Sequence, residues 1–177
     1  MKEYSWLERA KKLVEYNSEA LDFLRRVGGQ LPVARADAAA ISRLWVQADN
    51  MDETICRLLE EMNAGLLDGA GELDTTRGAS MRQSDIYEEA VYYDCTWSLL
   101  WGNGRGILVN LAVESLFHDF DMRVQSLLAS SSQPVRYPFT EDEFKEYLVN
   151  AYFAEATQEG VDTQPEHSSG DSAESLN

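Results

Sequence analysis

The sequence predicts a mainly α-helical fold, a bundle built on one long antiparallel helical hairpin. The first observation is a stretch from Asp37 to Met62 in which apolar residues recur at alternating steps of three and four. A helix of this length is a rod of about 40 Å. The second observation is a similar stretch just before it, after which only a short Gly/Pro connection follows. Long helices joined by so short a connection fold back on each other, which predicts a hairpin over residues 5–62.

The first helix of the hairpin begins at Ser5. Ser5 and Glu8 have the spacing of a capping box, in which each side chain accepts a hydrogen bond from the backbone N–H of the other residue. Gly28 and Gly29 end the helix, because glycine adopts the left-handed C-terminal conformation without strain. Asn17 interrupts the apolar face, and we interpret it as a register-fixing residue rather than a ligand. The apolar face consists of Trp6, Ala10, Leu13, Ala20, Leu24 and Val27.

Two glycine-rich segments follow the hairpin. Residues 63–84 are expected to form a loop, because four glycines interrupt every periodic pattern. Residues 102–106 read GNGRG. A dinucleotide-binding loop needs the spacing GxGxxG between a strand and a helix, so this segment is predicted to be a tight turn and not a phosphate site.

Residues 84–101 fit two structures. A helix from Asp85 has an apolar face at helical spacing and leaves Cys95 outside it. A strand from Val91 alternates apolar and polar residues and places Cys95 on its buried face. In that case the segment forms a small β-hairpin within residues 90–113. The helix is favoured, because SDIYEEA is a good helix start.

Two more helices complete the prediction. Residues 107–129 are apolar nearly all round at their start and continue with apolar residues at helical spacing, which indicates a long helix. The last helix begins after Thr140, which forms a capping box with Glu143, while Phe139 and Phe144 have the spacing of a hydrophobic staple.

Composition and charge restrict the class of protein. One domain is expected over residues 1–156, with residues 85–156 as its second helical part, followed by a disordered acidic tail over 157–177. The formal net charge of −16 disfavours binding to nucleic acid or to an anionic membrane. Two distant cysteines form neither a disulfide framework nor a zinc pattern. Without a signal-peptide core or an apolar run long enough to span a bilayer, a cytoplasmic location is expected.

A metal site has one set of candidates. Glu114, His118 and Asp121 would lie on one side of the helix predicted for residues 107–129, and carboxylates with an imidazole can hold a divalent cation. That side points away from the apolar stripe, so a solvated surface is the preferred interpretation and no cofactor is expected. Nucleophilic catalysis has no support either, since neither cysteine has a nearby histidine and no GxSxG is present. We therefore expect no enzyme.

The acidic helix faces are the remaining feature with functional content. Carboxylates recur on the outer side of the helix over residues 37–62, and a second group would follow in a helix from Asp85. Neighbours four residues apart on a helix lie ~6 Å from each other, and successive phosphates of a DNA strand rise by ~3.4 Å. Rows of carboxylates on packed helices can therefore approximate a row of phosphates in density, although not in register. The candidate partner-binding residues are Asp49, Asp52, Glu53, Glu60, Glu61, Asp85, Glu88 and Glu89.

These observations favour a non-catalytic, acidic protein-binding protein. It would act as an inhibitor or decoy that occupies the basic surface of a nucleic-acid-binding partner, as small acidic proteins that inhibit restriction or CRISPR machinery do; the likeness is one of composition only. An alternative is a helical adaptor or self-assembling structural protein whose hairpin seam, with Trp6 and Trp45, pairs with another copy. A second alternative is a metal-dependent hydrolase that uses the candidate metal ligands.

Overall fold

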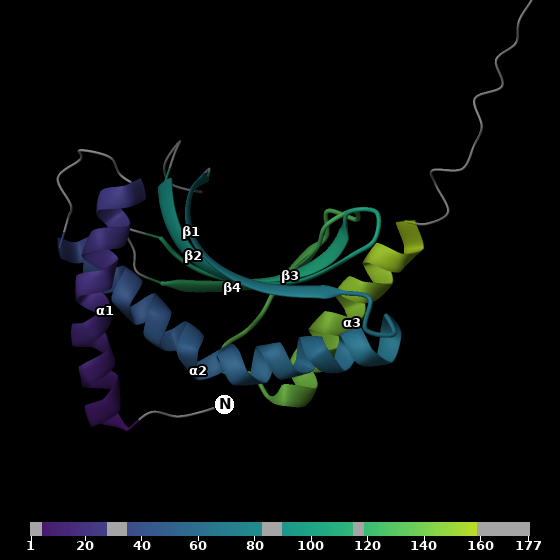
Figure 1. The fold of residues 1–177 in the computed structure, drawn as a ribbon, viewed down its shortest axis with the longest axis horizontal. Helices are drawn as coiled ribbons and strands as arrows, with labels where there is room; N and C mark the ends of the chain where they lie inside the picture. The colour runs from purple at the N-terminus through teal and green to yellow at the C-terminus, as the bar shows by residue number, and fades with distance from the viewer. Residues whose placement is uncertain (1–4, 28–34, 83–89, 115–118, 159–177) are drawn as a thin grey trace, which may run out of the picture.

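The computed structural model describes residues 5–27, 35–82, 90–114 and 119–158, and over these ranges the chain is an α+β protein (Figure 1). Helices pack on a five-stranded antiparallel sheet. The predicted mainly α-helical bundle is therefore wrong, because the chain between the second and the last helix forms strands. The elements in order are α1 (Trp6–Val27), α2 (Arg35–Leu66), β1 (Glu72–Arg82), β2 (Ala90–Trp101), β3 (Arg105–Glu114), β4 (Phe120–Ser126), β5 (Ser132–Pro134) and α3 (Glu141–Thr157).

The sheet is a meander in the order β1-β2-β3-β4-β5, with each strand antiparallel to its neighbour. Trp97 of β2 lies opposite Thr75 of β1 and Val109 of β3, and residues directly opposite each other point to the same face. Alternate residues of the three central strands, β2, β3 and β4, have buried side chains on this face. They are Tyr93, Cys95, Trp97, Leu99, Ile107, Val109, Leu111, Val113, Met122 and Val124.

Three sequence predictions fail at this sheet. The loop predicted for residues 63–84 contains β1, and the helices predicted for 84–101 and 107–129 are replaced by β2, β3 and β4. For β2 the less favoured interpretation was correct, because Cys95 is buried together with Trp97. The apolar run of β3 misled the prediction for a physical reason. Ala112 on the opposite face is also buried, so the period of two that marks a half-exposed strand is absent.

The glycine-rich turn and the last helix were predicted correctly. The turn between β2 and β3 places Asn103 at φ 66° and Gly104 at φ 71°, which glycine and asparagine tolerate best. At the start of α3, the Glu143 backbone N–H donates to Thr140 Oγ1 at 3.2 Å, and the Thr140 N–H donates to Glu143 Oε2 at 2.7 Å. Phe139 stacks on Phe144 at 4.8 Å between ring centroids. The local signals of the capping box therefore determined this helix end.

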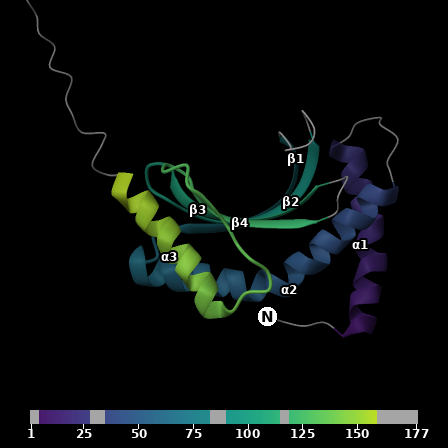
Figure 2. The ribbon, with the colours of Figure 1, turned by 180° about the vertical axis from the view of Figure 1, so that it is seen from behind.

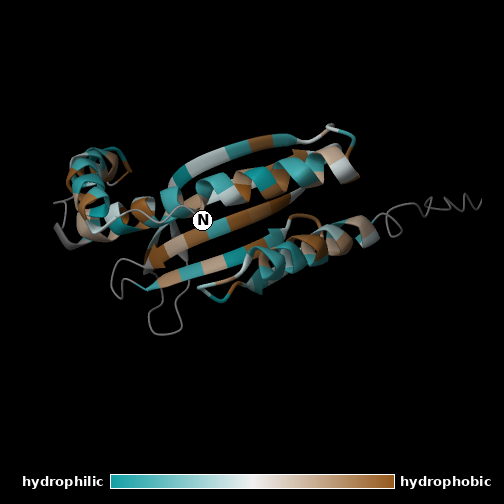
Figure 3. Ribbon diagram, turned by 90° about the horizontal axis from the view of Figure 1, so that it is seen from below, coloured by the Kyte–Doolittle hydropathy of each residue, from teal (hydrophilic) through white to brown (hydrophobic). Residues whose placement is uncertain are grey.

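α2 and α3 lie side by side on one face of the sheet, and in the described part of the chain no helix covers the other face (Figures 1 and 3). α2 contacts β1, β2 and β3, whereas α3 contacts β3 and β4. The view from behind shows the same arrangement, with α3 crossing below the sheet (Figure 2). The apolar seam predicted for residues 37–62 is real, but its residues face the sheet and not only α1. The second helical part predicted for residues 85–156 is wrong, since the described residues of this range form β2 to β5 and a single helix, α3.

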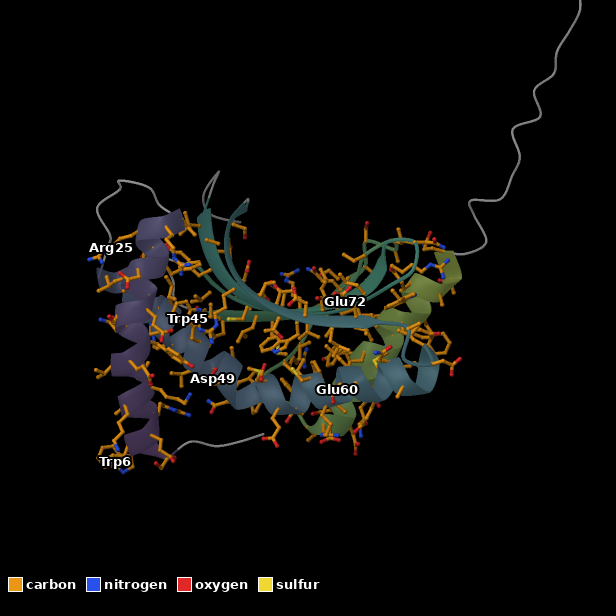
Figure 4. The ribbon with its side chains drawn as sticks, viewed as in Figure 1. Trp6, Arg25, Trp45, Asp49, Glu60 and Glu72 are labelled. Carbon is orange, nitrogen blue, oxygen red and sulfur yellow. The ribbon has the colours of Figure 1, made fainter. Side chains whose placement is uncertain are left out.

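α1 crosses the first part of α2 steeply instead of lying along its whole length (Figure 1). The buried residues of α1 are Ala20, Phe23 and Leu24, all in its C-terminal half. The N-terminal half of α1 extends past α2 and ends at Trp6 (Figure 4). The predicted disordered tail falls almost entirely on residues 159–177, which lie outside the described residues. None of the helices of the described ranges is long and apolar enough to cross a membrane.

Candidate protein-binding surface

An acidic surface is formed by the C-terminal half of α2 and the N-terminal half of α3, which we call the α2–α3 face. Both helices cover the same side of the sheet, so their outward-facing side chains are exposed on the same side of the molecule (Figure 3). Arg57 and Lys145 are its basic side chains. Its acidic side chains, all exposed, are Asp52, Glu53, Glu60, Glu61, Glu141, Asp142 and Glu146.

A chain of ion pairs joins the two helices across this face. Arg57 contacts Glu61 of its own helix at 2.6 Å and Glu141 of α3 at 2.5 Å. Glu141 in turn contacts Lys145 at 2.9 Å. Lys145 and then Arg57 lower the pKa of the Glu141 carboxyl, and Glu141 raises the pKa of the Lys145 ammonium. Both cations of the α2–α3 face are therefore already engaged with carboxylates of the same face.

The other carboxylates of the face have no such compensation. Within the described ranges, Glu53, Glu60, Asp142 and Glu146 form no ion pair. Glu60 lies on the side of α2 that is turned away from the sheet (Figure 4). A surface with unpaired carboxylates on two neighbouring helices has a negative potential that attracts cationic groups.

An apolar groove of about 310 Å³ runs between the two helices of this face. Its apolar walls are Leu58, Met62 and Leu66 of α2 and Leu148 and Val149 of α3, and Glu61 and Lys145 also line it. Phe153, which is 62 % exposed, follows Val149 by one helical turn and extends the apolar strip. A segment with both apolar and basic side chains is the complement of such a surface.

Asp49, a predicted partner-binding residue, lies in a different environment. Its side chain is turned toward α1 (Figure 4), where Oδ2 accepts hydrogen bonds from Lys12 Nζ at 2.5 Å and from the Tyr16 hydroxyl at 2.6 Å. Arg77 of β1 lies 3.7 Å from Oδ1. Asp49 thus ties α1 and β1 to α2 with a side chain that is only 19 % exposed.

The Arg77 side chain also contacts two aromatic rings. The Arg77 guanidinium lies 4.7 Å from the Trp45 ring centroid and 5.4 Å from that of Tyr16. Trp45 is buried and meets Tyr16 edge-to-face at 5.6 Å. Burial, and then the hydrogen bond to Asp49, raise the pKa of Tyr16. The cluster therefore holds α1, α2 and β1 together, and Trp45 is buried inside it and cannot contact another molecule.

Asp52 forms hydrogen bonds within the fold but remains exposed. Its Oδ1 accepts a hydrogen bond from the Trp97 indole Nε1 at 2.8 Å and a weak one from Cys56 Sγ at 3.7 Å. Burial and the Asp52 charge raise the pKa of the Cys56 thiol to about 11. Since Asp52 remains exposed, it can still contribute charge to the α2–α3 face.

The remaining predicted site residues lie partly outside the range that the structure describes. Asp85, Glu88 and Glu89 lie outside the described residues, as does His118. Of the other metal candidates, Glu114 is the last residue of β3, and Asp121 on β4 pairs with Arg123 at 2.7 Å. The helical spacing that would have placed them on one face does not exist in strands. The described residues contain no group of three or more His, Cys, Asp or Glu side chains that could hold a metal ion.

Sequence reasoning missed two features of the surface. The first is the apolar groove between α2 and α3, whose exposed residue Val149 was not singled out, although it lies one turn before Phe153. The second is the open face of the sheet, where Asn110 Nδ2 donates to Thr96 Oγ1 at 2.8 Å. That face also carries Glu72 of β1 (Figure 4). Its polar residues were assigned to loops and helices, so they were never expected to lie together.

Comparisons of the chain with protein-family models, with curated proteins and with solved structures find no match.

Proposed function

We propose that this chain is a non-catalytic protein-binding protein that occupies the basic surface of a nucleic-acid-binding partner and keeps nucleic acid away from it. The observation that supports this proposal is the α2–α3 face, which carries unpaired carboxylates on both helices and an apolar groove between the two helices. Surfaces that bind nucleic acid are rich in Lys and Arg, and a carboxylate array is their electrostatic complement. A cytoplasmic location is part of the proposal, and the free thiols of Cys56 and Cys95 are compatible with it.

The groove would supply apolar contacts, which are not weakened by salt as ion pairs are. Exposed ion pairs are screened by salt and contribute little net affinity. Apolar side chains of the partner that enter the space between Met62 and Val149 would add affinity that persists at higher ionic strength. The partner's contact segment is therefore expected to be amphipathic, with basic residues facing Glu53 and Glu60 and apolar residues in the groove.

Neither cysteine has the properties of a catalytic nucleophile. The pKa of Cys56 is raised to about 11 and that of Cys95 to about 12, in both cases mainly by burial. A thiol reacts as its thiolate, so both side chains are weak nucleophiles at neutral pH.

The test is capture of partners on the immobilised full-length chain from nuclease-treated lysate of its native host. Wild-type protein is compared with the Glu53→Lys/Glu60→Lys double variant and with the control Glu19→Lys/Glu72→Lys, which makes the same change in net charge on α1 and β1. We expect the first variant to lose basic nucleic-acid-binding proteins by at least ~10-fold and the control to retain them. Added duplex DNA should compete with the wild-type protein for the captured partner.

Circular dichroism and thermal unfolding establish that both variants fold. Equal capture of the same partners by the folded Glu53→Lys/Glu60→Lys variant would refute the proposal. Captured proteins that are indifferent to duplex DNA would show that the occupied surface is not a nucleic-acid-binding surface.

A further inference from the structure

A pocket of about 570 Å³ lies between α3 and the chain that connects β5 to it. In Figure 2 this connection leaves the sheet and runs to the first turn of α3. One wall consists of alternate residues at and after the end of β5, namely Pro134, Arg136 and Pro138. The other wall is one side of α3, and its residues are Glu143, Glu146, Tyr147 and Asn150. The volume falls within the range of about 300–1,000 Å³ that is typical of small-molecule sites.

This pocket is separate from the apolar groove between α2 and α3. On α3 the groove is lined by Leu148 and Val149. With 3.6 residues per turn, Tyr147 and Asn150 of the pocket each lie about 160° around the helix from one of these two residues. A ligand in the pocket therefore contacts a different side of α3 from a partner in the groove.

Opposite charges line the pocket without pairing with each other. Arg136 lies on one wall and Glu146 on the other, and neither forms an ion pair within the described ranges. Glu143 is different, because its carboxylate already accepts a hydrogen bond from the Thr140 backbone N–H at 2.7 Å. A molecule with one anionic and one cationic end would give Arg136 and Glu146 a charged partner each.

The rest of the lining offers hydrogen bonds and apolar contact. In the part of the chain that the structure describes, the side chains of Tyr147 and Asn150 form no hydrogen bond. An amide both donates and accepts, so Asn150 can pair with a peptide group of a ligand. The rings of Pro134, Pro138 and Phe139 provide an apolar surface in the same pocket.

We propose that this pocket binds a zwitterionic dipeptide, with its carboxylate on Arg136, its ammonium group on Glu146 and an apolar side chain against Phe139 and the two prolines. The two ends of an extended dipeptide lie about two residues apart, or ~6–7 Å. That length suits two protein charges that are too far apart to pair. A free amino acid carries both charges on one carbon atom and would leave much of the pocket unfilled. This binding site goes beyond the proposed function and does not depend on it.

A ¹H–¹⁵N NMR titration of the full chain with alanyl-phenylalanine tests the proposal. We expect a dissociation constant of ~0.1–1 mM, with the shifted amide signals in residues 134–139 and 143–150. N-acetyl-alanyl-phenylalanine and alanyl-phenylalanine amide each lack one charge and should bind at least ~5-fold more weakly. No shifts in these residues at ~10 mM dipeptide would overturn the proposal, as would equal binding of the two capped peptides and the free one.

Two variants assign the charged ends of the ligand. Arg136→Gln should no longer distinguish the free carboxylate from the amide, but should still prefer the free amino group to the acetylated one. Glu146→Gln should show the reverse. Glu60→Gln, an exposed carboxylate on α2, is the control and should bind like the wild type. Both replaced pocket side chains are exposed, so the variants are expected to fold, as circular dichroism would establish. An Arg136→Gln variant that keeps its preference for the free carboxylate would refute the assignment.

Discussion

Glu155 of α3 accepts a hydrogen bond from the backbone N–H of Gly106 on β3 at 2.9 Å, although Glu155 is fully buried. The same carboxylate also accepts from the backbone N–H of Leu128 at 2.9 Å and of Ala129 at 3.3 Å. One side chain thus satisfies backbone donors at the start of β3 and in the turn after β4. Because Gly106 also pairs with Leu100 of β2, Glu155 links α3 to two hairpins of the sheet.

Replacing this carboxylate should destabilise the fold. In Glu155→Gln the amide group turns an N–H toward backbone N–H donors, which leaves at least one buried donor without an acceptor. We expect the free energy of unfolding to fall by ~2–4 kcal/mol, measured by urea denaturation. Glu146→Gln, an exposed position on the same helix, is the control and should change it by less than ~0.5 kcal/mol. Equal stability of the two variants would show that the buried carboxylate is not structurally required.

Asp49 gives a second stability prediction, which separates support of the fold from partner binding. Asp49→Asn removes the negative charge that pairs with Lys12 and weakens the acceptor for the Tyr16 hydroxyl, while Arg77 remains beside the Trp45 and Tyr16 rings. The free energy of unfolding should fall by about 1–3 kcal/mol, with the Tyr16 region unfolding first in hydrogen exchange. Glu53→Gln, one turn along α2 and exposed, should leave it unchanged.

The contrast between α2 and the sheet explains how far the sequence predicts this fold. The capping box at Thr140 and Glu143 and the seam from Ile41 to Met62 depend on neighbours in sequence, so their helices were predicted correctly. The strands depend on neighbours across the sheet. Thr75 is placed by Trp97 opposite it, which is far away in sequence, and nothing local marks that pairing.

The same reasoning applies to the candidate surface. The periodicity of α2 predicts that Glu53 and Glu60 face outward, and they do. It does not predict that Asp49 is drawn toward α1, because that depends on Lys12 and Arg77 arriving from other elements. The groove beside Val149 needs α3 to lie next to α2, a tertiary arrangement that no single-helix pattern contains.

Cys56 should be slow to react with alkylating reagents. Burial and then the Asp52 charge raise the pKa of its thiol to about 11, well above the ordinary value of a cysteine. At pH 8 the thiolate fraction is then ~100-fold lower than that of a free thiol, and iodoacetamide labelling should slow to a similar extent. Asp52→Asn removes the charge contribution and should speed the labelling of Cys56. Labelling of native Cys56 at the rate of the unfolded chain would contradict the environment described for it.

The last prediction concerns stability at alkaline pH. The Tyr93 hydroxyl donates to Asp37 Oδ2 at 2.9 Å, and burial, followed by this hydrogen bond, raises the pKa of Tyr93. Because the folded state holds this proton more tightly than the unfolded state, the contribution of Tyr93 is fully present below the unfolded tyrosine pKa of ~10 and is lost as the pH rises above it.

Tyr93→Phe lacks both the hydrogen bond and the titration. At pH 7 the variant should be less stable than wild type by about 1 kcal/mol. Above pH ~10 the wild type loses up to ~1.4 kcal/mol per pH unit through Tyr93, whereas the variant does not. The difference in the free energy of unfolding should therefore shrink between pH 8 and pH 11, as measured by urea denaturation at each pH. Two curves that stay parallel over this interval would mean that Tyr93 loses its proton equally readily in the folded and unfolded states.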